Sequence, residues 1–383
     1  MQRSIPCMII RGGTSKGLYL LDADLPPAGE ERDKVLLRLM GSPDLRQIDG
    51  LGGAQSVTSK AAILAPSNRE GVDVDFTFAQ VSIDMPLVSY VGNCGNISVG
   101  AGPYAIECGL VKADSPVTRV RIFNTNTKKI IEEEIQTPDG YVDYSGDFKI
   151  PGVPGKAAPV KVVIQDPAGS VCGSLLPTGN VVDRLDVAGF GSIDASLVDA
   201  ANPLMFIFAK DVGLNGKENP NDICAMPGML ELLEKIRGEG ARKLKFIENS
   251  GDSPTKSPTV PKLTLIAPPS DYVCTTGETI KSDEVDILGR MMTMQQPHHT
   301  YALTGALCTA AAAAINGTLV QKICRPDADL NRLRIGHPGG VSEAGVDFET
   351  IPKRSGNNTE GIHLVSAYSY RTARLLMKGT AFF

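Results

Sequence analysis

Hydrophobic and polar positions near the N-terminus predict a β-rich start that is followed by one surface helix. Apolar residues over 5–10 indicate a strand that breaks at Gly12 and Gly13 and resumes over 17–21. In the segment 30–40, the apolar residues fall on one helical face, and Gly and Pro follow directly after it. This pattern predicts a helix that buries a single face.

The pattern then changes from a half-buried strand to a fully enclosed helix. Apolar and polar residues alternate over 72–78, which predicts a strand with one buried and one solvated face. From 96 to 111 the chain is apolar nearly all round and rich in small residues, as expected for a helix surrounded by protein. Pro103 inside this segment predicts either a bent axis or a late helix start.

The second half of the chain repeats this order of elements. The periodicity predicts a strand over 204–209, a helix near 229–236, a strand over 263–267 and another enclosed small-residue helix over 305–320. Two diverged copies of one structural unit explain the repetition. Two unrelated α/β domains that share this order by chance are the alternative.

Chain length and turn-rich segments predict two domains. The chain has 383 residues, and Gly- and Pro-rich stretches near 138–160 and 173–190 are the candidate connectors. We therefore predict an N-terminal domain over 1–180 and a C-terminal domain over 181–383.

Composition narrows the class of protein. Hydrophobic residues make up 42% and charged residues 21%, which is typical of a folded soluble protein, and the net charge of −5 argues against nucleic-acid binding. No apolar stretch reaches the roughly 18–20 residues that a bilayer requires, and the N-terminus lacks a signal-peptide pattern. The eight cysteines contain no CxxC pair, so a reducing cytoplasm fits better than a disulfide framework.

The start of the first enclosed helix is the first candidate for chemistry. A helix N-terminus offers unpaired N–H groups and a positive dipole end, so two enclosed helices that point at one cleft would bind a dicarboxylate. Cys94 precedes this helix among Gly and Asn residues, including Gly95 and Asn96, and such a position favours thiolate character. An ordinary buried cysteine of the core is the alternative.

A second polar cluster lies in the segment 47–60. Its glycines allow the backbone to approach a ligand, and Gln55 and Ser56 offer polar groups ahead of an apolar strand. Lys60 at the end of this cluster would act as a base if it were shielded from water. A solvated lysine whose ammonium reaches the surface is the alternative.

Three segments resemble cofactor- or metal-binding motifs, but none of them has the required residue spacing or residue types. The turn 11–17 lacks the spacing of a phosphate loop, and the segment 50–55 has Gln55 where a dinucleotide fingerprint needs its last Gly. His298 and His299 are adjacent, so they would point to different faces and make a poor metal pair. We therefore predict neither a metal nor an organic cofactor.

Five motifs taken together resemble one family over essentially the whole chain. They are RGGTSKG, RQIDGLGGAQSVTSK, NCGN, HHTYALTGALC and IGHPGG, in this order. They are similar to motifs of the PrpF-type methylaconitate isomerase, 4-oxalomesaconate tautomerase and 3-methylitaconate Δ-isomerase family, which has the fold of diaminopimelate epimerase. The resemblance implies an α/β (α+β) fold of two pseudo-symmetric domains, each an antiparallel sheet wrapped round a central helix, with the active site between them.

The resemblance also implies roles for individual residues. It assigns catalysis to Lys60 and Cys94. It assigns substrate contacts to Ser15, Asn93, Gly95, His298, Thr304, Gly305 and Ala306. The epimerase relatives have a second cysteine where this chain has Thr304, and a hydroxyl is too weak an acid or base to replace a thiol. Racemisation by a thiol pair is therefore disfavoured.

These observations lead to a functional hypothesis with two alternatives. We predict a cofactor-independent isomerase that moves a proton and a C=C bond within a small unsaturated di- or tricarboxylate, such as methylaconitate, 4-oxalomesaconate, 3-methylitaconate or aconitate. An amino-acid racemase or epimerase of the same fold and a non-catalytic carboxylate-binding protein are the alternatives. The predicted partner is this small molecule and neither nucleic acid nor a membrane, and formation of a homo-oligomer is left open.

Overall fold

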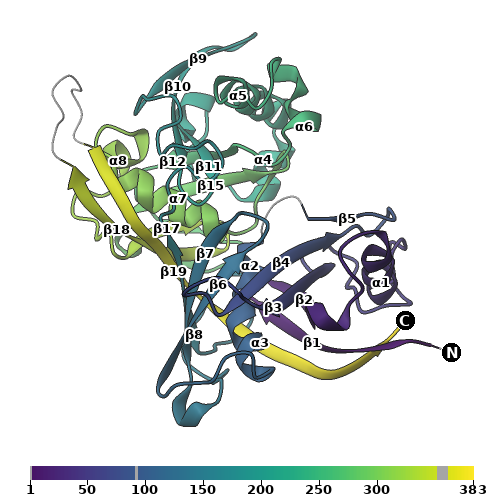
Figure 1. Cartoon of the computed structure of the whole chain (residues 1–383). Coiled ribbons are helices and arrows are strands. Elements are labelled where there is room, and N and C mark those ends of the chain that lie inside the picture. Colours follow the sequence, from purple (N-terminus) through teal and green to yellow (C-terminus); the bar gives the residue numbers. More distant parts are fainter. Residues whose placement is uncertain (1, 91–93, 352–360) are drawn as a thin grey trace. The chain divides into compact units, whose positions relative to one another are not determined.

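The chain forms two compact units (Figure 1). The computed structural model describes residues 2–90, 94–351 and 361–383. Unit 1 comprises Met1–Gln165 and Tyr370–Phe383, and unit 2 comprises Asp166–Ser369. The C-terminal strand returns to unit 1 because it pairs with the first strand of the chain. The domain boundary at 180 stays a prediction.

The described residues of unit 1 form eight strands of a mixed sheet and three α-helices. Its strands are β1 (Ser4–Gly12), β2 (Ser15–Leu21), β3 (Lys60–Pro66), β4 (Val74–Val81), β5 (Val88–Ser89), β6 (Val117–Asn124), β7 (Lys129–Gln136) and β8 (Pro159–Gln165). Its helices are α1 (Glu30–Met40), α2 (Gly95–Ser98) and α3 (Ala101–Glu107), with 3-10 turns at Asp22–Asp24 and Pro138–Gly140. Strand β19 (Gly361–Phe382) begins in unit 2 and ends in unit 1.

The surface helix predicted over 30–40 is confirmed as α1. Acidic residues occupy its first turn, and Gly41 ends it in the left-handed conformation (φ 75°) that glycine adopts without strain. The predicted apolar face, including Val35 and Leu36, is buried in a core with residues of β2, β3 and β4 such as Leu20 and Ile63. The periodicity of the sequence thus identified both the helix and the face that it buries.

The enclosed helix predicted over 96–111 is two short helices, α2 and α3. Gly100 separates them, and a Cβ at this position would lie 2.4 Å from the hydroxyl oxygen of Tyr19. Helix α3 begins at Ala101, two residues before Pro103, in keeping with the predicted late start. The contiguous helix was therefore wrong, but the enclosure is confirmed because α2 contacts β1 to β4 and α3 contacts β3, β6 and β7.

Unit 2 repeats the elements of unit 1 with additions. Its strands are β9 (Asp183–Val187), β10 (Gly191–Asp199), β11 (Pro203–Phe208), β12 (Lys262–Ala267), β13 (Tyr272–Val273), β14 (Thr279–Ile280), β15 (Ile287–Thr293), β16 (Gln296–Pro297), β17 (Leu333–His337) and β18 (Gly340–Ile351). Its helices are α4 (Pro220–Ala225), α5 (Met229–Lys243), α6 (Ser253–Lys256), α7 (Leu303–Ala314) and α8 (Leu319–Ile323), with 3-10 turns at Ala209–Val212, Ser250–Asp252 and Ser282–Glu284.

Strand pairing follows the same order in both units. In unit 1, β1–β2 is antiparallel, β2–β3 parallel, β3–β4 antiparallel, β4–β6 parallel, and β6–β7 and β7–β8 antiparallel. In unit 2, β10–β11 is antiparallel, β11–β12 parallel, β12–β15 antiparallel, β15–β17 parallel, and β17–β18 and β18–β19 antiparallel. An identical succession of six pairings is the signature of two copies of one unit, as the sequence predicted.

The second enclosed helix is also interrupted. The prediction over 305–320 covers α7 and α8, which are separated at Gly317, where φ is +90°. Nearly every residue of α7 is buried, and the helix contacts β10, β11 and β18. Helix α5 packs against β9 and β12 and is longer than predicted. Gly238 and Gly240 within it allow the close approach of Ser250 and Met205.

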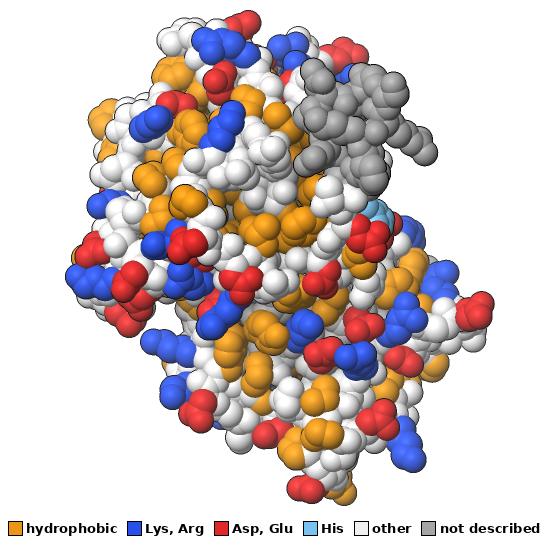
Figure 2. All heavy atoms as spheres, turned by 90° about the vertical axis from the view of Figure 1, so that its left-hand side faces the viewer, with side chains coloured by type: hydrophobic (Ala, Val, Ile, Leu, Met, Phe, Trp, Pro, Cys, Tyr) orange, Lys and Arg blue, Asp and Glu red, His pale blue; other side chains and the backbone are white. Residues whose placement is uncertain are grey.

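The chain ends lie side by side in unit 1. Strand β1 pairs with β19, and Arg3 and Phe383 exchange two backbone hydrogen bonds of 3.0 and 2.9 Å. Figure 2 shows one face of the molecule, on which acidic and basic side chains are interspersed with hydrophobic ones. None of the helices in the described ranges combines the length and apolar character needed to cross a bilayer.

Candidate active site

The turn between β1 and β2 is pressed against α2 because two glycines allow it. A Cβ at Gly12 would lie 2.2 Å from the carbonyl oxygen of Asn96, and one at Gly13 would lie 2.1 Å from the side-chain Oδ1 of Asn96. Gly13 also has a positive φ of 50°, which other residues rarely adopt. The Asn96 Nδ2 donates to Thr14 Oγ1 at 2.9 Å. The RGGTSKG motif therefore fixes this turn against the start of α2.

Cys94 lies at the start of α2, beside the same turn. It occupies the N-cap position, and its carbonyl accepts a hydrogen bond from the Ser98 N–H at 3.0 Å. The Sγ atom is 4.0 Å from the Oγ of Ser15, which is buried, whereas Cys94, Gly95 and Asn96 are half-buried. The structure thus brings four predicted residues together, while Asn93 lies outside the described residues.

Lys60 is the first residue of β3 and points into a shielded environment. Only 8% of the residue is exposed, and its Nζ donates to Gln80 Oε1 at 2.6 Å. The ammonium also lies 5.0 Å from the ring centroid of Phe78, a distance typical of a cation–π contact. Within the described part of the chain, no carboxylate forms an ion pair with Lys60. The side chain therefore does not extend into solvent.

Gly17 connects the surroundings of Lys60 to those of Cys94. A Cβ at Gly17 would lie 2.9 Å from the carbonyl oxygen of Lys60 and 2.9 Å from the Cδ1 of Ile97. The parallel pairing of β2 with β3 sets this proximity, since Leu18 lies opposite Ala61. The backbone of Lys60 and the Ile97 side chain of α2 therefore both lie against Gly17 of β2.

The polar loop before Lys60 is held in place, but the predicted residues on it are exposed. Buried Gln47 donates to Ser42 and Ser59 and accepts from the Ala54 N–H, while the Lys16 N–H donates to the Val57 carbonyl at 2.9 Å. Gln55 and Ser56 are exposed on this loop, next to the turn that carries Ser15. Both side chains are therefore open to solvent.

Unit 2 presents the start of α7 at the topologically equivalent place. Ala302 is the N-cap, Thr304 is half-buried, and Gly305 and Ala306 are buried inside the first turn. The Ala306 N–H donates to the Ala302 carbonyl at 2.9 Å, so the donors without an intrahelical partner are those of residues 303–305. A Cβ at Gly305 would lie 2.1 Å from the Cε of Met291, which explains the glycine.

His298 in unit 2 has a defined protonation state. Its Nδ1 accepts a hydrogen bond from the Thr300 N–H at 3.0 Å, so Nδ1 carries no proton. Burial, and to a smaller extent the charge of Lys262, lower the pKa of His298 to about 4. The ring is therefore neutral near pH 7, and its Nε2–H is a donor that makes no hydrogen bond to the described residues.

Two residues were not singled out from the sequence, Gln80 beside Lys60 in unit 1 and Lys262 in unit 2. Gln80 orients Lys60, and its Nε2 donates to the carbonyls of Ser59 and Ser56 at 2.9 and 3.2 Å. Lys262 is the first residue of β12, the place that Lys60 holds in β3, and burial together with the charge of Arg237 lowers its pKa to about 8. The internal repeat was the signal that could have identified Lys262.

Metal-ligand clusters are absent from the described ranges, where no group of three or more His, Cys, Asp or Glu side chains is placed to hold a metal ion. All eight cysteines lie in the described ranges and are unpaired.

Comparison with known proteins relates this arrangement to a set of isomerases. A family model described as "PrpF protein" matches residues 2–383. A 3-methylitaconate isomerase of Eubacterium barkeri is 47% identical over 99% of this chain and 97% of its own length. A (4E)-oxalomesaconate Delta-isomerase of Novosphingobium is 40% identical over 99% of this chain and 97% of its own length.

Solved structures give the same relationship and define the fold. A methylitaconate Δ-isomerase crystal structure is 46% identical, covers 100% of this chain and 96% of its own, and superimposes with a TM-score of 0.87. A hydroxyproline epimerase from Agrobacterium vitis, 11% identical, covers 100% of this chain and 94% of its own with a TM-score of 0.55. The predicted diaminopimelate epimerase-like fold is thereby confirmed.

The alternatives left open by the sequence are now reduced. A non-catalytic carboxylate-binding protein is wrong, because the relatives that match nearly the whole chain are isomerases. The likeness to the epimerase, at low identity, concerns the fold alone. The resemblance inferred from the five motifs is confirmed, and the chain belongs to the PrpF protein family and is an isomerase.

Proposed function

We propose that this isomerase catalyses a 1,3-proton shift in a small unsaturated di- or tricarboxylate, with Lys60 and Cys94 as its acid–base pair. The observation that carries the proposal is a shielded lysine without a carboxylate partner among the described residues, whose backbone meets Gly17 of β2 together with Ile97 of α2, the helix that begins directly after Cys94. A base and an acid placed around one segment of β2 are what a proton shift between two carbons requires. No redox step or transferred group is involved.

The proposed reaction passes through a dienolate. The Lys60 amine removes the proton from the carbon allylic to the unsaturated carboxylate, and the C–H electron pair becomes the new C=C bond. The original π electrons move onto the carboxylate, and Cys94 then delivers its proton two carbons away. Proton exchange with water returns the ammonium and the thiolate to their starting states. The net change is the position of one proton and one double bond.

Polar groups around Cys94 support the negative charge of the intermediate in this proposal. The backbone N–H groups of Gly95 and Asn96 and the hydroxyl of Ser15 are already oriented by the packing of the turn against α2. Donors that are fixed before reaction stabilise developing charge without reorganisation. Asn93, Gln55 and Ser56 are proposed as further substrate contacts.

In unit 2 we propose that Lys262, His298 and the first turn of α7, with Thr304, Gly305 and Ala306, bind a carboxylate of the substrate. Lys262 donates to the Thr259 carbonyl at 3.2 Å and has no acidic ion-pair partner among the described residues. The neutral His298 supplies an N–H and the helix start supplies backbone donors. A small-molecule polycarboxylate is thus the proposed partner, and the eight unpaired cysteines support a cytoplasmic location.

The experiment that tests the function is an NMR assay of isomerisation against methylaconitate, 4-oxalomesaconate, 3-methylitaconate and aconitate. We expect turnover of at least one member and no racemisation of proline or diaminopimelate. These substrates differ by a methyl or an oxo group, so discrimination among them depends on the shape of the pocket. Failure of all four, with racemisation of either amino acid, would contradict the proposal.

Lys262→Met is expected to raise KM by roughly 10- to 100-fold, which corresponds to the loss of one charge-assisted hydrogen bond to the substrate. The effect on kcat should be smaller. Because the pKa of Lys262 is about 8, the wild-type KM should rise as pH increases through 8 and the lysine loses its charge, and the variant should lose this dependence. Exposed Lys256, which pairs with Asp252, provides the matched control Lys256→Met. An unchanged KM in Lys262→Met would refute the carboxylate contact.

A further inference from the structure

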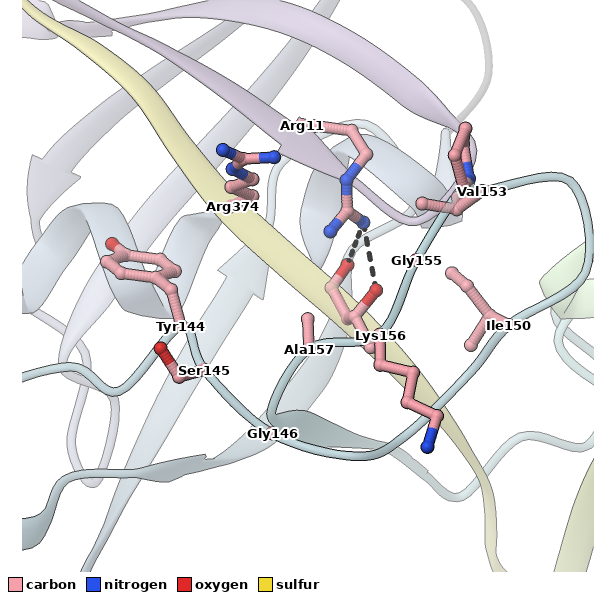
Figure 3. A pocket seen from close by; sticks show the side chains of 12 residues that line it. Arg11, Tyr144, Ser145, Gly146, Ile150, Val153, Gly155, Lys156, Ala157 and Arg374 are labelled. Carbon is pink, nitrogen blue, oxygen red and sulfur yellow. Dashed lines mark hydrogen bonds between the residues drawn. The ribbon is translucent and has the colours of Figure 1, made fainter.

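Unit 1 contains a cavity of about 390 Å³ that the proposed reaction does not use. Strands β1 and β19 form one wall, and the segment 144–157 curves round the other (Figure 3). Among the described residues, the cavity is lined by three basic side chains, Arg11, Lys156 and Arg374, and by no aspartate or glutamate. The volume lies within the roughly 300–1,000 Å³ that small-molecule sites usually have.

Arg11 and Arg374 face each other across two antiparallel strands. They are direct partners in the pairing of β1 with β19. Like charges directly opposite each other in a sheet destabilise it, and burial together with the charge of Arg374 lowers the pKa of Arg11. Neither guanidinium forms an ion pair with a carboxylate in the parts of the chain that the structure describes. The two charges therefore lack a counter-ion from these residues.

The Arg11 side chain is held in place by hydrogen bonds, but some of its hydrogen-bond donors are unused. Its Nη1 donates to the carbonyls of Gly13 and Thr372 at 3.0 and 2.7 Å and to the Thr372 hydroxyl at 2.9 Å. Figure 3 shows two hydrogen bonds of Arg11 as dashed lines. The Nε and Nη2 groups make no hydrogen bond to the described residues, although a guanidinium offers five donors. A guanidinium that is fixed in position and has unused donors can bind the oxygen atoms of a ligand.

A purely structural role explains only part of this arrangement. The Nη1 bonds tie the turn at Gly13 to β19, and that function needs Arg11 alone. Arg374 adds repulsion without contributing to the tie. Lys156, whose ammonium pairs at 3.3 Å with the exposed Asp147, adds a third positive charge.

We propose that this cavity is a binding site for a small oxyanion with two or more negative charges, with carboxylate or phosphate oxygens between Arg11 and Arg374. The planar fork of an arginine matches such oxygens in a bidentate manner. An anion here converts the repulsion between the two arginines into two attractions. The site goes beyond the proposed function, since none of its residues belongs to the proposed catalytic or substrate-binding set.

The test is isothermal titration of the full chain at low ionic strength with citrate and with inorganic phosphate as separate probes. We expect Arg374→Gln to weaken binding at this site by tenfold or more, because one of the two arginines is lost. The matched control is Arg184→Gln, an exposed arginine of unit 2 paired with Asp194, which should bind within twofold of wild type. Arg374 is exposed, so the variant should fold, and removing the repulsion should raise the melting temperature of the anion-free protein.

The outcomes separate this site from the substrate site. Binding of citrate alone identifies a carboxylate ligand, binding of phosphate alone identifies a phosphate ligand, and either supports the proposal, as does binding of both. Anion binding that survives Arg374→Gln but is lost in Lys262→Met belongs to the substrate site and overturns it. An equal loss in Arg184→Gln, which indicates a general charge effect, or binding of neither probe, also overturns it.

Discussion

Lys60→Met is expected to reduce turnover by roughly 10²- to 10⁴-fold, the range that one general base contributes. Methionine has nearly the same length as lysine and suits the shielded position beside Phe78, so packing should be retained. The lost groups are the amine and its hydrogen bond to Gln80. The measurement is kcat for the substrate identified in the panel, with circular dichroism and the unfolding midpoint as tests of the fold.

Two further variants decide whether Lys60 acts as a base or only as a charge. Lys60→Arg keeps the positive charge but cannot lose a proton near neutral pH, so it should be as impaired as Lys60→Met. Lys34→Met, an exposed lysine of α1 paired with Glu30 and Glu31, should keep wild-type turnover. Substantial activity of Lys60→Arg would assign Lys60 to binding charge and would leave the base unidentified.

The sequence predicted those parts of the fold that depend on local periodicity. The helix α1, the alternating strand β4 and the enclosure of the small-residue segments all follow from the spacing of apolar residues over a few turns. The repeat was visible for the same reason, because each copy preserves the order of local elements. Strand ends differed by one to three residues, as at β4 and β12.

Features that depend on distant contacts were not predictable in this way. The need for a glycine at position 100 results from the close approach of the Tyr19 hydroxyl on β2. The return of β19 to β1 is a pairing between the two ends of the chain. Gln80 reads as an ordinary polar position of an alternating strand, although it orients Lys60. Only the pairing of β3 with β4 makes this relationship apparent.

Cys94→Ala is expected to separate proton removal from proton return. If Lys60 removes the allylic proton and Cys94 returns it, the variant still forms the dienolate and exchanges deuterium at the allylic carbon with water. It lacks the acid that protonates the distant carbon, so isomerisation should fall by roughly 10²- to 10⁴-fold. NMR follows both quantities in one sample of allylically deuterated substrate, as loss of the label and as appearance of the product.

The ratio of the two rates assigns the roles of the residues, because a damaged site would lose exchange and isomerisation together. Exposed Cys224 of α4 supplies the control Cys224→Ala, in which both rates should match wild type. Lys60→Met should stop label loss and product formation alike, since no dienolate forms without the base. If Cys94→Ala stops both while Lys60→Met still loses the label, Cys94 is the residue that removes the proton and the proposed roles are reversed. If Cys94→Ala isomerises at the wild-type rate, the thiol takes no part in the proton shift, and the acid must be sought among the groups around Ser15 and the start of α2.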